Sequence, residues 1–286
     1  MEYQYIKTEA RDNVLILTMH DPPTRNALGQ EMAEEMMDAL DRFEDDSEQR
    51  VLLLTGTEPS FCSGANVRRF NQSNQEREKP SGDGDPPVTL PWGKMEARLA
   101  HRQERVGTRA QANRLPLRLH NLQKPSIAAV NGFAMGVGMG VALACDIRYA
   151  AENAVFCEAF SRMGLVPGDG SSWQLPRLIG LSNTLLLQYT GDRIDGNEAY
   201  RLGVVSKVLP GDSLMEEAME LAARLAKGPL VSLSLIKYLV HRSLETTFEE
   251  SLELADVAQE HARSTQDHQE AVQAFVEKRQ PKFQGR

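Results

Sequence analysis

The chain has 286 residues, of which 41% are hydrophobic and 25% charged, and its formal net charge is −8 at pH 7. This length suffices for one large core or two smaller ones, and the acidic balance argues against nucleic acid or an anionic membrane as the main partner. No apolar run approaches the ~20 residues of a membrane span, and the first residues resemble neither a signal peptide nor a transit peptide. We therefore expect a soluble, cytoplasmic protein whose three cysteines are reduced thiols.

The first half of the chain alternates predicted strands and helices. A β-rich run ends in a turn at 14–23, an apolar strand follows at 51–56, and a helix lies between them. The helix is predicted because apolar side chains recur at helical spacing: Leu28, Met32, Met36, Ala39, Leu40 and Phe43. Further strands are predicted at 126–132, 147–151 and 154–160, and a loop that runs into a helix at 135–146.

The second half of the chain has a helical pattern. Helices are predicted at 182–190, 195–202, 213–227, 229–243, 246–262 and 268–279. Strands early and helices late are compatible with an α/β or an α+β class. Residues 68–124 interrupt the pattern, because they contain 12 Lys and Arg against 6 Asp and Glu in an otherwise acidic chain. We interpret them as a flexible loop followed by an amphipathic helix, which forms either a solvated surface excursion or a pocket wall or basic rim for an anionic ligand.

The glycine-rich run "NGFAMGVGMGVALACD" (131–146) is the most distinctive local feature. A dinucleotide fingerprint needs GxGxxG after the first strand, whereas Gly136, Gly138 and Gly140 form GxGxG in mid-chain. A phosphate loop needs Gly-Lys-Ser/Thr at its end, which is absent here. The glycines instead allow close backbone approach, and a helix that begins near Val137 points unpaired N–H groups outward, toward a developing oxyanion.

A second donor is expected from the loop "EPSFCSGANVRRF" (58–70), directly after the strand at 51–56. At this point the chain resembles the crotonase (enoyl-CoA hydratase/isomerase) superfamily. The stretches that resemble it are "PPTRNALGQEM", "FCSGANV", "KPSIAAVNGFAMGVGMGVALACDIRYA", "GLVPGDGSSWQLPRLIG", "TGDRIDGNEAYRLGVVSKVLP" and "FVEKRQPKF". They occur in the family's order and cover nearly the whole chain apart from 70–115.

The resemblance implies an α/β fold, a crotonase-like spiral of ββα units with C-terminal helices that drive trimerisation. It implies a core with the acyl-CoA site at 1–205, a variable excursion at 68–120 within it, and a C-terminal helical region at 206–286. The expected partners are an acyl-CoA thioester and copies of the chain, in a homotrimer or a dimer of trimers. No cofactor is expected beyond coenzyme A as part of the substrate, and no metal, nucleic acid or membrane.

The resemblance also implies an oxyanion hole, in which the backbone N–H groups of Ala65 and Val137 stabilise a thioester enolate. The family's usual glycine at the second position is valine here, and the acid of its Gly-Ala-Asp triplet is Asn66. Hydratases of the family place two glutamates where this chain has Gly140 and Phe160. A hydratase mechanism with two glutamates is therefore not expected.

Two other carboxylates are candidates for acid–base chemistry. Asp169 lies in "VPGDGSS", one residue beyond the aspartate of isomerase-like relatives, and otherwise caps a loop. Glu158 lies two residues before Phe160, on the same face if 154–160 is extended, and otherwise forms a structural or intersubunit ion pair. An apolar acyl pocket raises the pKa of a carboxyl group, which enables proton transfer near neutral pH. Ser171 and His120 are expected to be structural rather than catalytic.

The resemblance places further residues along the coenzyme A path. These are Arg25, Ala27, Ser63, Asn66, Gly136 and Phe160, with Lys278 and Lys282 of the tail on phosphate, from this or a neighbouring subunit, or else in a solvated basic tail. The expected reaction is a double-bond shift or a variant hydration or dehydration of an enoyl-CoA. Two alternatives stay open: a hydrolase of a C–C bond or a thioester, and an acyl-CoA-binding protein without catalysis.

Overall fold

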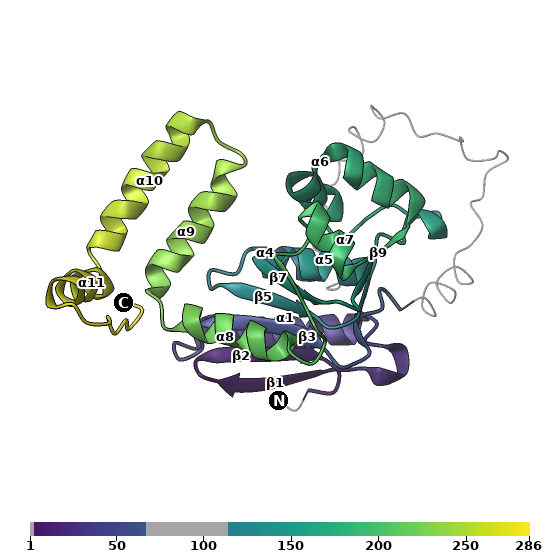
Figure 1. The fold of residues 1–286 in the computed structure, drawn as a ribbon, viewed down its shortest axis with the longest axis horizontal. Coiled ribbons are helices and arrows are strands. Elements are labelled where there is room, and N and C mark those ends of the chain that lie inside the picture. The colour runs from purple at the N-terminus through teal and green to yellow at the C-terminus, as the bar shows by residue number, and fades with distance from the viewer. Residues whose placement is uncertain (1–2, 67–113) are drawn as a thin grey trace, which may run out of the picture.

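The computed structural model describes residues 3–66 and 114–286 (Figure 1). Two sheets lie at the centre, and three helices extend away from them at one end of the molecule (Figure 1). Within the described residues, no helix is long and apolar enough to cross a membrane.

The larger sheet has six strands in the order β1-β2-β3-β5-β7-β10. Its members are β1 (Ile6–Arg11), β2 (Val14–Met19), β3 (Val51–Gly56), β5 (Ser126–Val130), β7 (Ile147–Ala151) and β10 (Lys207–Leu209). Only the β1–β2 pair is antiparallel among these neighbours. The central strands β3 and β5 are buried along their full length, and such strands in a parallel sheet have continuous apolar runs because both faces are covered.

The smaller sheet has four strands in the order β4-β6-β8-β9. Its members are β4 (Ser60–Cys62), β6 (Phe133–Met135), β8 (Val155–Cys157) and β9 (Arg193–Asp195). The chain passes from β3 to β4, from β5 to β6 and from β7 to β8, so each turn of the spiral contributes one strand to each sheet. This alternation is the ββα spiral that the resemblance implies.

Helices cover the sheets and fill the turns of the spiral. They are α1 (Gln30–Asp45), α4 (Leu115–His120), α5 (Val137–Leu143), α6 (Ser171–Thr190), α7 (Gly196–Leu202), α8 (Leu214–Ala226), α9 (Leu230–Ser243), α10 (Phe248–Arg263) and α11 (Gln266–Glu277), with short 3₁₀ turns η1 (Pro22–Thr24) and η4 (Ser161–Met163). The predicted apolar stripe of α1 is buried, as an amphipathic surface helix requires. α8 packs against β3, β5 and β7.

Two predicted elements differ from the structure. The strand expected at 154–160 is confined to Val155–Cys157, and Phe160 already has helical backbone angles at the start of η4. Glu158 and Phe160 are therefore not on one face of an extended strand. The helix expected from 182 begins at Ser171: a first segment contains Pro176, and a second helical segment continues after the break at Gly180.

Most of the basic excursion at 68–124 lies outside the described residues. Its described end, from residue 114, includes α4. The predicted division between residues 205 and 206 stays a prediction; β10 and α8, which follow it, pack with β7 and the core sheet.

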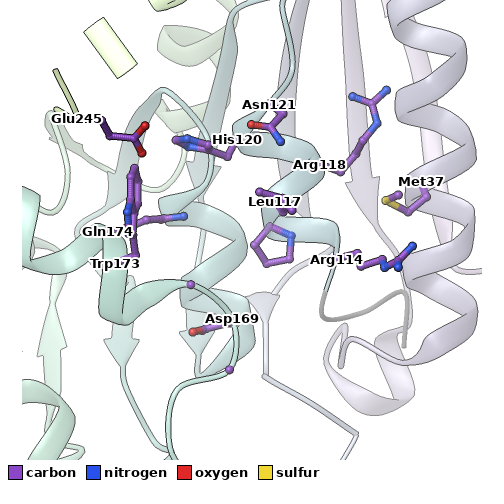
Figure 2. A pocket seen from close by; sticks show the side chains of 13 residues that line it. Met37, Arg114, Leu117, Arg118, His120, Asn121, Asp169, Trp173, Gln174 and Glu245 are labelled. Carbon is purple, nitrogen blue, oxygen red and sulfur yellow. The ribbon is translucent and has the colours of Figure 1, made fainter. Parts of the chain in front are cut away.

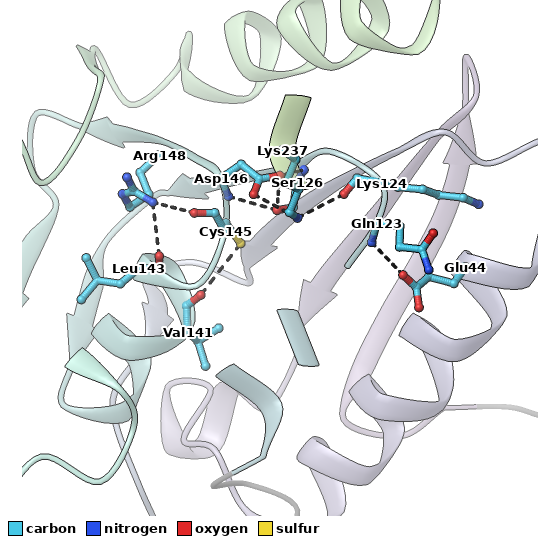
Figure 3. A network of polar contacts seen from close by, with 10 residues as sticks. All are labelled: Glu44, Gln123, Lys124, Ser126, Val141, Leu143, Cys145, Asp146, Arg148 and Lys237. Atoms are coloured by element: carbon cyan, nitrogen blue, oxygen red, sulfur yellow. Dashed lines mark hydrogen bonds and ion pairs between the residues drawn. The ribbon is translucent and has the colours of Figure 1, made fainter. Parts of the chain in front are cut away.

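The C-terminal helices are attached to the core by a polar network at the start of β5 (Figure 3). Asp146 accepts hydrogen bonds from the N–H and hydroxyl of Ser126, at 2.8 and 3.1 Å. The other carboxylate oxygen of Asp146 forms an ion pair with Lys237 of α9 at 3.0 Å, and both side chains are largely buried. This pair ties α9 to the end of α5 and the start of β5 and β7.

Candidate active site

The two backbone donors expected from the sequence each follow a glycine with positive φ. Gly64 has φ of +106° before Ala65, and Gly136 has φ of +49° before Val137. Side chains strongly disfavour such angles, so glycine is required at both turns. Val137 is the first residue of α5, where an N–H has no partner within the helix. Among the described residues, neither the Ala65 nor the Val137 N–H donates a hydrogen bond.

The two donor loops contact each other through their backbones. A Cβ atom on Gly64 would lie 3.0 Å from the Met135 carbonyl oxygen, and one on Gly138 would lie 2.5 Å from the carbonyl oxygen of Cys62. No side chain fits between these segments. The glycines of the run at 131–146 thus bring the start of α5 against the loop that contains Ala65, as the sequence predicts for close backbone approach.

A third loop is fixed to the same place by Asn26. Its buried side chain donates to the carbonyl oxygens of Thr57 and Ser60, both at 2.7 Å, and accepts from the Asp21 N–H at 2.9 Å. The neighbouring Arg25 carbonyl accepts from the Ser63 N–H at 3.1 Å. The structure therefore pairs Arg25 with Ser63, two of the residues expected on the coenzyme A path, and pairs Leu28, next to Ala27, with Gly64 and Ala65.

Gly140 lies directly against the carboxyl group of Asp169. A Cβ atom on Gly140 would lie 2.6 Å from Cγ and 2.7 Å from Cβ of Asp169, and closer still to Oδ2. The Asp169 side chain thus occupies the space that a side chain at position 140 would need. Asp169 is 3% exposed, and its Oδ2 has no hydrogen-bond partner among the described residues.

Glu158 and Asp169 approach each other through Ser171, the first residue of α6. The Ser171 hydroxyl lies 2.8 Å from Glu158 Oε2 and 2.8 Å from Asp169 Oδ1. The Ser171 N–H also donates to Asp169 Oδ1, at 3.1 Å. Glu158 reaches this contact from the segment just after β8, so the end of that strand does bring the two candidate carboxylates together.

Burial raises the pKa of both carboxyl groups. For Glu158, loss of solvation and then the charge of Asp169 raise the pKa to about 8 against opposing hydrogen bonds from Ser171 and Gln188. For Asp169, burial raises the pKa, and hydrogen bonds from Ser171 oppose the shift. Two buried carboxyl groups joined through one hydroxyl cannot both be ionised cheaply, so burial and their mutual charge favour a form in which one of them keeps its proton.

A cavity of about 820 Å³ opens beside Asp169 (Figure 2). Its described lining comes from α1, from α4 and the residues on either side of it, from the loop at 168–170, from the start of α6 and from Glu245 after α9, and it includes Met37, Leu117, Asp169 and Trp173. Glu158 is not among the described lining residues. Asp169 therefore forms part of the cavity wall although it is almost fully buried, and Glu158 has no described contact with the cavity.

His120 also faces this cavity, but it is packed between aromatic rings. Its ring stacks on His241 with centroids 4.3 Å apart and contacts the edge of Trp173 at 5.2 Å. Burial and then the neighbouring His241 and Lys237 lower the pKa of His120. A neutral imidazole held by two rings fits the packing role expected for it.

The remaining predicted residues divide into near and distant ones. The Phe160 ring lies beside Gly136, where a Cβ would be 3.6 Å from Phe160 Cζ. Lys278 directly follows α11 and Lys282 lies in the tail after it; α11 lies at one end of the molecule, apart from α5 (Figure 1). The role of these two lysines stays a prediction.

Comparison with known proteins gives the class of protein. The model of the enoyl-CoA hydratase/isomerase family matches residues 9–86 and 93–286. The chain belongs to this family, has the crotonase fold, and is an enzyme of the hydratase/isomerase type.

Individual relatives cover nearly the full length of the chain. It is 33% identical to the 1,2-epoxyphenylacetyl-CoA isomerase of Escherichia coli K12, over 99% of each chain. It is 31% identical to the short-chain-enoyl-CoA hydratase of Clostridium acetobutylicum, over 98% of this chain and 97% of that one. The crystal structure of a putative enoyl-CoA hydratase from Streptomyces coelicolor A3(2) superposes with a TM-score of 0.84 at 30% identity, over 100% and 96% of the two chains.

The sequence did not indicate two residues that organise this site. Ser171 is expected to be a turn or core residue, and only the tertiary structure places its hydroxyl between two carboxyl groups. Asn26 fixes the third loop from a left-handed backbone conformation, with φ of +59°. An asparagine before an apolar helix was the available signal, since asparagine tolerates this conformation better than most residues.

Proposed function

We propose that this enzyme shifts a double bond in an enoyl-CoA thioester by moving one proton. The thioester carbonyl accepts hydrogen bonds from the N–H groups of Ala65 and Val137, which stabilise the enolate. Asp169 removes a proton from Cα through Oδ2 and returns it at Cγ, so one C–H bond breaks, another forms, and the composition of the substrate is unchanged.

The observation that supports this proposal most strongly is the contact between Gly140 and Asp169. The space where hydratases of the family have a glutamate contains the Asp169 carboxyl instead, with an unpartnered oxygen beside Gly140. One carboxyl group suffices for transfer between Cα and Cγ, whereas placing and splitting a water needs two groups that face the substrate. Glu158 has no described contact with the cavity, which favours isomerisation over hydration.

The experiment incubates the protein with a panel of 2-enoyl-, 3-enoyl- and β-ketoacyl-CoA thioesters and follows the products by mass spectrometry and chromatography. Isomerisation gives a product of unchanged mass, and in deuterium oxide it incorporates deuterium at Cα or Cγ. Hydration adds one water, and hydrolysis releases fragments. Either of the last two outcomes, or binding without turnover, would contradict the proposal.

The Asp169→Asn substitution tests the acid–base role. It preserves the shape of the side chain and the hydrogen bond from the Ser171 N–H, but removes the base, so kcat is expected to fall by ~10²–10⁴-fold. Binding of a substrate-like thioester, measured by calorimetry, is the control for an intact site. Unchanged kcat with Asn at this position would exclude Asp169 as the base.

We also propose that the enzyme works as a homotrimer or a dimer of trimers and takes the phosphates of coenzyme A partly on Lys278 and Lys282 of a neighbouring subunit. The distance of α11 from the donor loops along the molecule supports an intersubunit role for these lysines (Figure 1).

A further inference from the structure

Ser171 has a single hydroxyl proton and two carboxyl neighbours at hydrogen-bond distance. Its oxygen lies 2.8 Å from Glu158 Oε2 and 2.8 Å from Asp169 Oδ1. A serine hydroxyl donates one hydrogen bond and accepts others. If it donates to one carboxylate, the contact with the other requires that the second carboxyl group donates its own proton to the serine oxygen. The geometry therefore describes one carboxylate, one carboxylic acid and a hydroxyl between them.

The surrounding contacts decide which carboxyl group has the proton. Asp169 Oδ1 accepts both the hydroxyl and the N–H of Ser171, and such donors favour the ionised form. Glu158 is 1% exposed and receives no backbone donor among the described residues. The charge is thus best placed on Asp169, and the proton on Glu158.

A fourth group orients the serine. The Gln188 side-chain N–H lies 3.4 Å from the Ser171 oxygen, and the other end of the same amide accepts from the Ser172 hydroxyl at 3.2 Å. In this contact the Ser171 oxygen accepts a hydrogen bond from Gln188. The hydroxyl proton of Ser171 is therefore free to be donated to a carboxylate. The hydroxyl is buried completely, so no bulk water competes for these contacts.

We propose that Ser171 is a positioning residue that joins Glu158 and Asp169 into a pair with one shared proton, in which Glu158 holds the proton and Asp169 is the base. The inference rests on the proposed function. When Asp169 Oδ2 takes the proton from Cα, Glu158 keeps its own, and Asp169 returns the transferred proton to Cγ. Glu158 therefore does not touch the substrate and acts only through Ser171. Because Glu158 stays neutral, Asp169 has the only negative charge of the pair.

This arrangement predicts a bell-shaped dependence of kcat on pH. On the acidic side activity rises as Asp169 ionises. On the alkaline side Glu158 loses its proton near its pKa of about 8, and the second buried charge opposes formation of the negatively charged enolate. The apparent pKa values of both limbs are properties of the coupled Glu158–Asp169 pair. Removal of the Ser171 hydroxyl is therefore expected to change both values.

The test compares the pH profiles of Ser171→Ala, Glu158→Gln and Ser206→Ala with that of the unaltered enzyme. Ser206 is the matched control, because it is exposed, lies just before β10 and has no described side-chain contact with Glu158, Asp169, Ser171 or Gln188. Ser171→Ala is expected to shift the acidic limb upward by about one pH unit and to lower kcat at pH 7 by ~10-fold, with KM little changed. Glu158→Gln mimics the protonated acid and is expected to abolish the alkaline limb while retaining activity at pH 7 within several-fold.

A second measurement does not depend on turnover. Carbon-13 NMR of labelled carboxyl groups follows the titration of Glu158 and Asp169 in the free protein, and Ser171→Ala is expected to move both titrations. A shifted titration without isomerase activity would leave the coupled pair intact and refute only the proposed function. A Ser171→Ala profile and titration equal to those of Ser206→Ala, or an alkaline limb that survives in Glu158→Gln, would overturn the inference. Circular dichroism confirms that each variant is folded.

Discussion

At residue 140 only a hydrogen atom fits beside the Asp169 carboxyl group. The resemblance implies a glutamate at this position in hydratases of the family, whereas here the Asp169 side chain, from the loop before α6, fills the space beside Gly140. A side chain at 140 and the observed position of Asp169 therefore exclude each other. Glycine at position 140 is therefore needed for the Asp169 carboxyl group to lie where it does.

The Gly140→Ala substitution tests this condition. Its Cβ would overlap Cγ and Oδ2 of Asp169, so the carboxyl group must move, and we expect kcat to fall at least ~100-fold, with overpacking that lowers the free energy of unfolding by about 1–3 kcal/mol. Gly211→Ala is the control, because the nearest atom to its added Cβ is 3.8 Å away, on Asn153. Equal activity of the two variants would show that Asp169 is not held against residue 140.

The raised pKa of Glu158 predicts how stability depends on pH. Below its ordinary pKa of 4.5 the group is protonated in both the folded and the unfolded chain. Between pH 4.5 and about 8 the folded chain keeps a proton that the unfolded chain has released, so the free energy of unfolding falls as pH rises, and above about 8 the loss is complete. In Glu158→Gln, the fall in the free energy of unfolding between pH 5 and 8 is expected to be smaller by on the order of 3 kcal/mol. Urea unfolding of both proteins at pH 5, 6.5 and 8 measures it, and parallel curves would contradict the shift.

At the scale of elements, the first turn of α5 is the part of the fold on which the proposed chemistry depends. Gly136, the N-cap of α5, has non-helical backbone angles, with ψ of −119°. Val137 is the first residue of the helix, so its N–H has no hydrogen-bond partner within α5. The Gly136 N–H donates to the Cys157 carbonyl oxygen at 2.8 Å, so the pairing of β6 with β8 holds the residue before Val137 in place. Preorganised donors of this kind stabilise charge without reorganisation.

The Val137→Pro substitution removes this donor while respecting the helix. Proline is favoured at the first position of a helix, where the missing N–H has no partner anyway. We expect kcat to fall by ~10²–10³-fold, while the secondary structure measured by circular dichroism is unchanged. Val137→Ala is the matched comparison, because it shortens the side chain and keeps the N–H, and its loss should stay below tenfold. Equal losses in the two variants would mean that the side chain matters and the donor does not.

At the scale of the whole molecule, the C-terminal helices expose large apolar side chains to water, which is unfavourable for an isolated chain. α9, α10 and α11 project from the sheets (Figure 1), and Phe248, Val257 and Phe275 are 81%, 68% and 85% exposed. Large exposed apolar patches mark interaction surfaces. They support the proposal that copies of the chain cover these helices.

Sedimentation equilibrium tests this at the concentrations used for activity. The protein is expected to sediment as three or six chains, and Val257→Asp together with Phe275→Asp to shift it toward one chain, because buried unpaired charges oppose association. Glu253→Gln is the control, since Glu253 is also exposed on α10 and the change adds no charge. A monomer of unaltered protein would contradict the proposed assembly.

Much of the fold followed from the sequence because its signals are local. The continuous apolar runs of β2, β3 and β5 and the helical spacing in α1 and α8 to α11 indicate these elements directly. The strands β4, β6 and β9 have three residues each, too few for a period to be recognised, and pair only because the spiral brings them together.

The sequence by itself determined the family and the ββα fold, since the motifs that carry them depend on residue identity and spacing along the chain; the two donor loops and the replacement of the hydratase glutamates stay predictions. Only the tertiary structure decided that Asp169 fills the space beside Gly140 and that Ser171 lies between two carboxyl groups. The physical reason is that β8 ends at Cys157 and α6 begins at Ser171, and the spiral packs these two ends together. This packing depends on the whole fold, so no local sequence pattern indicates it.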